Sequence, residues 1–259
     1  METPILDLSN VSFSAAATTI LPSVSQSFSA GKIYGLVGPN GSGKSTLLKL
    51  MARQLAPDAG TIRLDGKPIH QLKSREFARA IAYMPQFTPA TDGMTTRELV
   101  ALGRFPWHGS LGRFTAEDAG RVDDAIRRTD LSSLADRNVA SLSGGERQRA
   151  WIAMMLAQNA RCLLLDEPTS ALDLSHQAAV VSMVRELARE NGLTVVLVLH
   201  DINLTARYCD EIIALNRGRI IASGQPAEII QADALKAVFG VDMGIFPHPL
   251  SGQPVSYLL

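Results

Sequence analysis

The sequence has few cysteines, no excess of charge of either sign and no long hydrophobic run. Its 25 Lys and Arg residues balance its 25 Asp and Glu residues, so the formal net charge is zero. Nucleic-acid-binding proteins usually carry a basic excess, so this balance argues against a DNA or RNA partner. Cys162 and Cys209 are too few for a disulfide framework, and the apolar run around Cys162 indicates a buried thiol.

No apolar stretch approaches the roughly 20 residues that a membrane-spanning helix needs. The longest runs, such as Val195–Leu199, have the length of buried strands. The first residues, Met1–Ile5, show no basic segment followed by an apolar core, so no secretory signal is expected. We therefore expect a soluble, cytosolic protein whose membrane role would depend on a partner.

What the sequence does contain is an alternation of short apolar runs with longer stretches of helical periodicity. This alternation is typical of an α/β fold with a largely parallel sheet. Buried strands are expected at Ile33–Val37, Cys162–Leu165 and Thr194–Leu199. Hairpin turns are expected at Asp65-Gly66 and at Asn216-Arg217-Gly218, each between two short apolar runs.

The 259 residues are expected to form one domain with two subdomains. From about residue 89 to 160 the strand pattern gives way to helical periodicity, which predicts a helical subdomain. That subdomain would be inserted into an α/β core made of residues 1–88 and 161–259. The hairpin pattern in the first part of the chain predicts an antiparallel β subdomain there.

The strongest motif is the phosphate loop Gly38-Pro39-Asn40-Gly41-Ser42-Gly43-Lys44-Ser45, followed by Thr46. It satisfies G-x-x-x-x-G-K-[ST] and lies between a predicted strand and a predicted helix, Ser45–Arg53. Glycines let successive N–H groups curl around phosphates, and the helix directs its positive end at them. Lys44 would bind the terminal phosphates and the Ser45 hydroxyl would ligate Mg²⁺. The motif predicts a P-loop NTPase core that binds the phosphates of a nucleotide, but by itself it does not separate a kinase from a GTPase or a motor protein.

A second acidic motif follows the apolar run Leu163–Leu165. Asp166 and Glu167 are expected at the carboxyl end of a parallel strand, which is where ligands bind in open α/β sheets. Asp166 suits a magnesium ligand. Glu167 is predicted to polarise the water that attacks the γ-phosphate. Taken alone, such a pair is more often a solvated strand end, so this interpretation depends on the phosphate loop.

The third motif is Leu142-Ser143-Gly144-Gly145-Glu146, which opens a predicted helix. Ser143, Gly144 and Gly145 would form a second cradle of N–H groups for an anion. The three motifs together resemble the nucleotide-binding subunit of ATP-binding cassette (ABC) transporters, whose signature is LSGGQ. The resemblance covers essentially the whole chain, and Glu146 stands where Gln is usual.

The resemblance implies that two cassettes face each other head to tail, with the signature of one closing over the ATP of the other. It implies a catalytic role for Gln86, which would sense the γ-phosphate and ligate Mg²⁺, and for His200, the switch histidine. The segment Ser170-Ala171-Leu172-Asp173 resembles the loop that crosses between the two copies, and Asp173 is the residue of this loop expected at the nucleotide site. Ala15 stands where many cassettes stack an aromatic residue on adenine, so no adenine-stacking residue is predicted.

Some segments resemble particular branches of this family, and these branches indicate which molecule the transporter would carry. Segments 168–177 and 199–210 are similar to the branch that serves iron–siderophore, haem and cobalamin importers. Segment 103–114 and Phe246-Pro247-His248-Pro249 closely resemble the ATPase of the bacterial ferric hydroxamate importer. The resemblance implies import of ferric hydroxamate-type siderophores, with haem or cobalamin import, or an exporter, as alternatives.

The expected partners follow from the same resemblance. They are a second copy of the chain, integral membrane permease subunits and, indirectly, a periplasmic or surface siderophore-binding protein. The chain would then lie at the cytoplasmic face of the bacterial inner membrane. Segment 103–114 is rich in aromatic residues and arginine, so either it forms a partner interface or Phe105 and Trp107 fill the core of the helical subdomain. His108, His176 and His248 are scattered without ligand spacing, so no iron site is expected.

Overall fold

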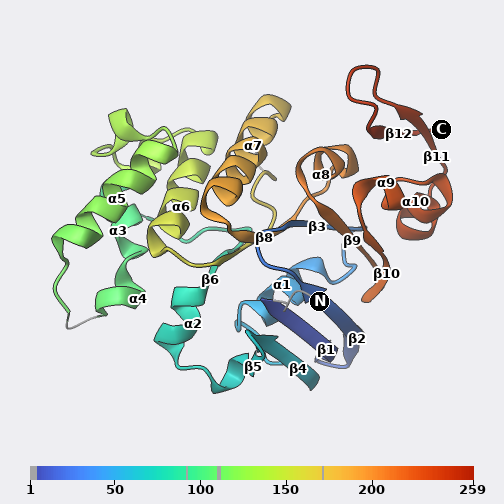
Figure 1. The fold of residues 1–259 in the computed structure, drawn as a ribbon, viewed down its shortest axis with the longest axis horizontal. Coiled ribbons are helices and arrows are strands. Elements are labelled where there is room, and N and C mark those ends of the chain that lie inside the picture. The colour runs from blue at the N-terminus through green and yellow to red at the C-terminus, as the bar shows by residue number, and fades with distance from the viewer. Residues whose placement is uncertain (1–4, 92, 110–111, 171) are drawn as a thin grey trace. The chain divides into compact units, whose positions relative to one another are not determined.

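The computed structural model describes residues 5–91, 93–109, 112–170 and 172–259. Ser110, Leu111 and Ala171, which belong to segments discussed above, lie outside the described residues, as do residues 1–4 and 92. The chain divides into two compact units, the first made of residues 1–71 and 194–259 and the second of residues 72–193. The elements of both units are labelled in Figure 1.

The first unit contains a four-stranded antiparallel sheet in the order β2-β1-β4-β5. Its strands are β1 (Leu6–Ala15), β2 (Thr18–Phe28), β4 (Ala59–Leu64) and β5 (Lys67–Pro68). Leu6, Leu8 and Val11 of β1 are buried. The expected turn at Asp65-Gly66 is confirmed, since Leu64 pairs with Lys67 and both turn residues have positive φ.

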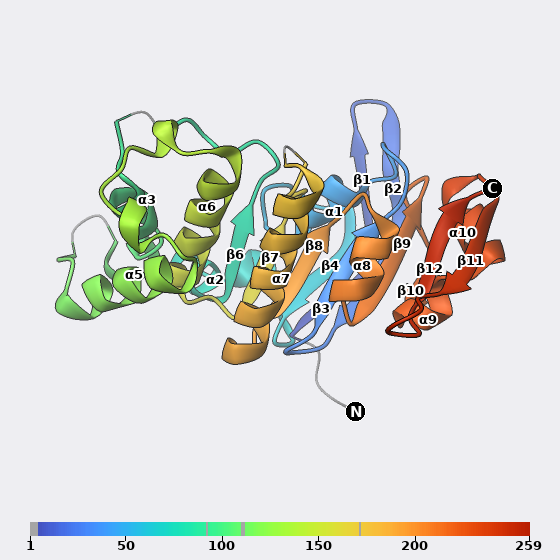
Figure 2. The same ribbon diagram turned by 90° about the horizontal axis from the view of Figure 1, so that it is seen from above.

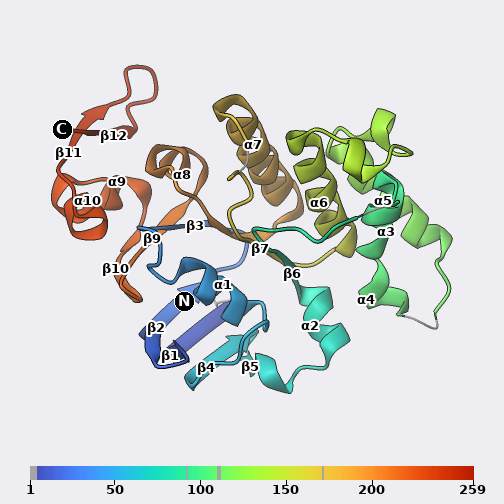
Figure 3. The ribbon, with the colours of Figure 1, turned by 180° about the vertical axis from the view of Figure 1, so that it is seen from behind.

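The same unit contains parallel strands around β3 (Ile33–Val37), whose five residues are all buried. β3 pairs in parallel with β8 (Thr194–Val198) and with β9 (Glu211–Asn216), and β10 (Arg219–Gly224) pairs antiparallel with β9. The expected parallel strands and the second hairpin are therefore confirmed. α1 (Lys44–Met51) follows β3, and Figures 1 and 3 show it between β3 and the strands β1 and β2.

The C-terminal part of the first unit covers β9 with helices. These are α8 (Ile202–Tyr208), α9 (Pro226–Ile229) and α10 (Ala232–Phe239), and their apolar residues form one buried cluster with β9. A hairpin of β11 (Met243–Pro247) and β12 (Pro254–Leu258) follows (Figure 2). Asn203 fastens it to α8, because the Asn203 side chain accepts from Ser256 N–H at 2.8 Å and donates to the Ser256 carbonyl at 2.9 Å.

The second unit holds two parallel strands, β6 (Ile81–Met84) and β7 (Cys162–Leu165), and most of the helices. Its helices are α2 (Ser74–Ala80), α3 (Thr96–Leu102), α4 (Phe105–His108), α5 (Ala116–Arg128), α6 (Gly144–Gln158) and α7 (Leu174–Asn191). The described residues between 89 and 160 form helices and no named strand. The unit is wider than the expected helical subdomain because it also includes α2, β6, β7 and α7, so the subdomain limits remain a prediction.

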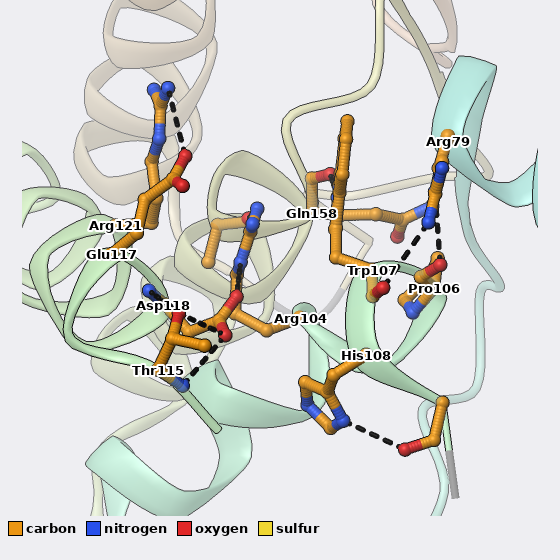
Figure 4. A network of polar contacts seen from close by, with 12 residues as sticks. Arg79, Arg104, Pro106, Trp107, His108, Thr115, Glu117, Asp118, Arg121 and Gln158 are labelled. Atoms are coloured by element: carbon orange, nitrogen blue, oxygen red, sulfur yellow. Dashed lines mark hydrogen bonds and ion pairs between the residues drawn. The ribbon is translucent and has the colours of Figure 1, made fainter. Parts of the chain in front are cut away.

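The described residues of segment 103–114 are partly packed and partly exposed, and Figure 4 shows the polar contacts of this region. The Trp107 indole donates to the Gln158 carbonyl at 2.7 Å, and the guanidinium carbons of Arg79 and Arg104 lie 4.6 and 5.0 Å from the centre of its ring. Phe105 and Phe114, by contrast, are 54% and 48% exposed. Trp107 therefore belongs to the subdomain, whereas the two phenylalanines leave an apolar surface. Among the described residues, no helix combines the length and apolar character needed to cross a membrane.

Candidate nucleotide site

The phosphate loop connects β3 to α1 in the first unit, as the sequence predicts. Gly38 has a φ of 141°, and a Cβ there would lie 2.0 Å from the Leu215 carbonyl oxygen. Gly41 has a φ of 76° but open space around it. The loop therefore needs glycine at position 38 for both conformation and space, and at position 41 for conformation alone.

Two buried polar side chains lie inside this loop. Lys44 is only 4% exposed, and its ammonium donates to the carbonyls of Gly38 and Pro39 at 2.8 and 3.0 Å. Ser42 is 2% exposed, and its hydroxyl has no hydrogen-bond partner among the described residues. A buried hydroxyl without a partner and a buried cation are costly unless a ligand compensates them. Both fit a loop that receives phosphate oxygens.

His200 lies at the same edge of the sheet as the phosphate loop. Leu36 of β3 pairs with Val198 of β8, and Leu199 N–H donates to the Leu36 carbonyl at 3.2 Å. Gly38 and His200 each come two residues after that pair, so the carboxyl ends of adjacent parallel strands present them together. His200 is exposed. The first unit thus joins two of the predicted site elements.

The second unit joins Gln86 to Glu167. Met84 of β6 pairs with Leu165 of β7, so Gln86 and Glu167 each follow the paired positions by two residues. The Gln86 amide Nε2 donates to Glu167 Oε2 at 2.5 Å. Glu167 has a φ of 51°, an uncommon conformation for a non-glycine residue that is often found at functional sites.

Asp166, between β7 and Glu167, is held in the protein interior. It is 2% exposed, and its N–H donates to the Met84 carbonyl at 2.9 Å. Tyr83 of β6 faces it, and burial together with the Asp166 charge raises the pKa of the Tyr83 hydroxyl. Tyr83 therefore stays protonated at neutral pH. A buried carboxylate suits a group that a cation will neutralise.

The Ser143–Gly145 motif begins α6. Ser143 is the N-cap residue, and its hydroxyl accepts from Glu146 N–H at 3.3 Å while its own N–H donates to the Glu146 carboxylate at 2.8 Å. These hydrogen bonds lower the pKa of Glu146. Glu performs the capping that Gln would perform at this position, which gives a physical reason why Glu146 can replace the usual Gln.

Asp173 is the N-cap residue of α7. It is contacted by His176, which the sequence did not indicate as part of the site. The Asp173 carboxylate accepts from His176 N–H at 2.9 Å and from His176 Nδ1 at 2.8 Å. The other edge of the His176 ring faces Gly145, where a Cβ would lie 3.0 Å from His176 Cδ2. The structure thus brings Asp173 and Gly145 to the same histidine. In the sequence, the only indication of this contact was the Asp-x-x-His spacing of Asp173 and His176.

Ala15 lies at the end of β1, exposed, and pairs with Thr18 of β2. Ala16, Ala17 and Thr18 of this hairpin tip are exposed as well, so the tip offers no aromatic ring for a base. Among the described residues, this tip therefore supplies no ring that could stack on adenine.

These arrangements define a nucleotide-binding α/β protein with a phosphate loop, an acidic strand end and a capped Ser-Gly-Gly helix. The family model for the ABC transporter matches residues 21–170, which is more than half of the chain. The chain belongs to the ABC transporter family, and it is an ATPase of the kind found in import systems.

Several curated relatives are similar over most of their length. The achromobactin transport ATP-binding protein of Dickeya dadantii is 44% identical over 93% of this chain and 89% of its own. The iron(3+)-hydroxamate import ATP-binding protein of Bacillus subtilis is 42% identical over 91% and 88%. The cobalamin import ATP-binding protein of Halobacterium salinarum is 41% identical over 95% of this chain but 62% of its own.

Solved structures agree with the fold. A chain assigned to the metal-chelate type of ABC transporter, in an inward-facing conformation, has a TM-score of 0.86 at 28% identity and is matched over 99% of this chain and 97% of its own. The cbiO1 protein of Clostridium perfringens, part of an ABC transporter complex, has a TM-score of 0.78 at 27% identity over 91% and 94%. The predicted P-loop fold with parallel and antiparallel strands is confirmed.

Proposed function

We propose that Glu167 is the general base of ATP hydrolysis, with Gln86 and His200 as its catalytic partners. The observation that carries this proposal is the hydrogen bond from Gln86 to Glu167 beside the buried Asp166. The amide hydrogen bond holds the Glu167 carboxylate in one orientation, which a base for the attacking water requires. His200, presented with the phosphate loop, would contact the γ-phosphate.

Lys44, Ser42 and the N–H groups of the phosphate loop would bind the phosphates of ATP. Ser45, Gln86 and Asp166 would hold Mg²⁺, since a hydroxyl, an amide oxygen and a carboxylate are the hard oxygen donors that this cation takes. When bound, Mg²⁺ neutralises charge on the β- and γ-phosphates. The burial of Asp166 and the unpartnered Ser42 hydroxyl are the features of this chain that support the fit.

The complete site would need a second copy of the chain. One phosphate loop and one Ser143–Gly145 motif occur in the sequence, and each would contribute half of a site in a head-to-tail dimer. Two bound ATP molecules would close the dimer, and hydrolysis would reopen it. To shift the equilibrium between open and closed dimer from 1:99 to 99:1, ATP must bind the closed dimer about 5.5 kcal/mol more tightly than the open one. Phosphates bound from both sides can supply energy of that order.

The cargo we propose is a ferric hydroxamate-type siderophore. Relatives with more than 40% identity carry the names of achromobactin transport and iron(3+)-hydroxamate import proteins. The chain would act at the cytoplasmic face of the bacterial inner membrane, bound to permease subunits that receive cargo from a periplasmic or surface binding protein. The exposed Phe105 and Phe114 offer an apolar surface for such a partner.

Cobalamin is the second candidate cargo, because a cobalamin import protein is 41% identical over 247 residues. A transport assay separates the two. The tagged chain would be purified from its source membranes with its permease and reconstituted in proteoliposomes with internal ATP. Uptake of radiolabelled ferric hydroxamate above that of cobalamin and haem is expected. Uptake of cobalamin or haem instead would overturn the cargo assignment, and ATP-driven efflux would show an exporter.

A further inference from the structure

His176 links two segments of the second unit that the proposed function uses together. We infer that His176 is a positioning residue, which holds the Asp173 loop against the first turn of α6 so that both reach the ATP of the second copy in one fixed arrangement. This inference rests on the proposed dimer.

The first half of the link is the bond to Asp173. Three donors converge on Asp173 Oδ1, namely His176 N–H at 2.9 Å, His176 Nδ1 at 2.8 Å and the Ser175 hydroxyl at 2.8 Å. These hydrogen bonds, with those from His176 the largest, hold the pKa of Asp173 well below its usual range. An ionised carboxylate only accepts, so Nδ1 must carry the proton. This fixes the tautomer of the neutral ring and its orientation.

The second half of the link is the contact with Gly145. His176 Cδ2 lies 3.0 Å from the place where a Cβ of residue 145 would be, which is closer than most Cβ contacts in proteins. The ring therefore packs on the bare backbone of Gly145. Glycine at this position leaves the N–H of the helix start accessible and also makes room for the ring.

Capping of α7 alone does not account for the choice of histidine. Asp173 is already the N-cap, and the backbone N–H of residue 176 bonds to it whatever the side chain is. A histidine in the first turn gains nothing from the helix dipole, which favours acidic side chains there. Ser175 donates to the same oxygen of Asp173. The three atoms nearest to a Cβ at Gly145, however, all belong to His176. Ser175 therefore provides a matched control.

The experiment compares His176→Ala, His176→Asn and Ser175→Ala with the wild-type chain. His176→Asn keeps a donor close to the position of Nδ1 but removes the part of the ring that packs on Gly145. For each variant, ATPase activity is measured over a range of protein concentrations. The affinity of the isolated chain for a fluorescent ATP analogue and the thermal unfolding midpoint are measured as well.

We expect both His176 variants to raise the protein concentration at half-maximal specific activity by about threefold or more, since a hydrogen bond contributes about 1 kcal/mol. Nucleotide affinity of the isolated chain should not change. Ser175→Ala should behave like the wild type. Wild-type behaviour of His176→Ala, full rescue by His176→Asn, or an equal loss in Ser175→Ala would each overturn the inference. Wild-type activity strictly proportional to protein concentration would instead refute the proposed dimer, and the inference with it.

Discussion

Gln86 Nε2 lies 2.5 Å from Glu167 Oε2, and this hydrogen bond joins the ends of two parallel strands. Because Met84 and Leu165 are in register, the loops that leave β6 and β7 present an amide and a carboxylate at the same height. Glu167 reaches this place through a left-handed backbone conformation. The bond gives the proposed base a defined orientation.

Replacing Glu167 by Gln should abolish hydrolysis while preserving ATP binding, because the phosphate loop is untouched and only the base is lost. ATP should then trap a stable dimer, which gel filtration would detect as a shift in elution. Glu117→Gln, on the exposed face of α5, is the control and should hydrolyse ATP at the wild-type rate. A Glu167→Gln chain that stays monomeric with ATP, or that remains active, would contradict the role given to Glu167.

Specific ATPase activity of the wild-type chain should rise with protein concentration. Each proposed site needs a phosphate loop and a Ser143–Gly145 motif from different copies, so the proposed active species is a dimer. Total activity should therefore increase more than linearly until most of the protein is dimeric. The measurement is phosphate release over a wide range of protein concentrations, and strict proportionality in the range of the dimer dissociation constant would argue against shared sites.

Substitutions of glycine in the phosphate loop should differ in their effect on stability. Gly38→Ala should lower the free energy of unfolding by about 2 kcal/mol or more, because its φ is positive and the Cβ would clash with the Leu215 carbonyl. Gly41→Ala has open space and should cost only about 1 kcal/mol of conformational strain.

Gly120→Ala on α5 is the control for this series. Gly120 has a helical position and nothing within reach of a Cβ, so alanine should stabilise the chain by about 0.5 kcal/mol or more. Urea unfolding without nucleotide measures all three variants. Equal effects at positions 38 and 41 would mean that the close approach to Leu215 does not decide the stability of the loop.

The buried pair Arg104–Asp118 should be important for the stability of the second unit (Figure 4). Asp118→Asn would leave the Arg104 guanidinium, which is 3% exposed, without its counter-charge. We expect a loss of about 3 kcal/mol in the free energy of unfolding. Glu117→Gln, which removes an exposed partner 4.0 Å from Arg121, should cost less than about 0.5 kcal/mol.

The same pair predicts a pH dependence. Burial alone would raise the pKa of Asp118, but hydrogen bonds from Thr115 and Arg104 outweigh it and lower the pKa from 3.8 to about 2. A carboxylate with a lowered folded-state pKa contributes stability above its unfolded pKa and loses it as the pH falls toward the folded value. The stability difference between wild type and Asp118→Asn should therefore shrink between about pH 4 and pH 2. A constant difference in urea unfolding over this range would contradict the assignment.

The sequence by itself determined the local elements of this protein. Ile33–Val37 and Cys162–Leu165 were predicted with the bounds that the structure shows, because a continuous apolar run bounded by turn residues leaves few alternatives to a buried strand. The phosphate loop was equally evident, since only glycine tolerates the backbone that the loop needs. Cys162 is buried as expected, and burial raises the pKa of its thiol to about 12.

Only the tertiary structure decided which of these elements meet. The bond between Gln86 and Glu167 depends on the register of two strands that are far apart in the chain, and no local pattern encodes that register. The contact of His176 with Gly145 depends on how α7 packs beside α6, and a single histidine in a helix gives no sign of it. The C-terminal hairpin of β11 and β12 also went unpredicted, because its strands are short and partly exposed. Local sequence sets the conformation of a segment, but long-range packing chooses its neighbours.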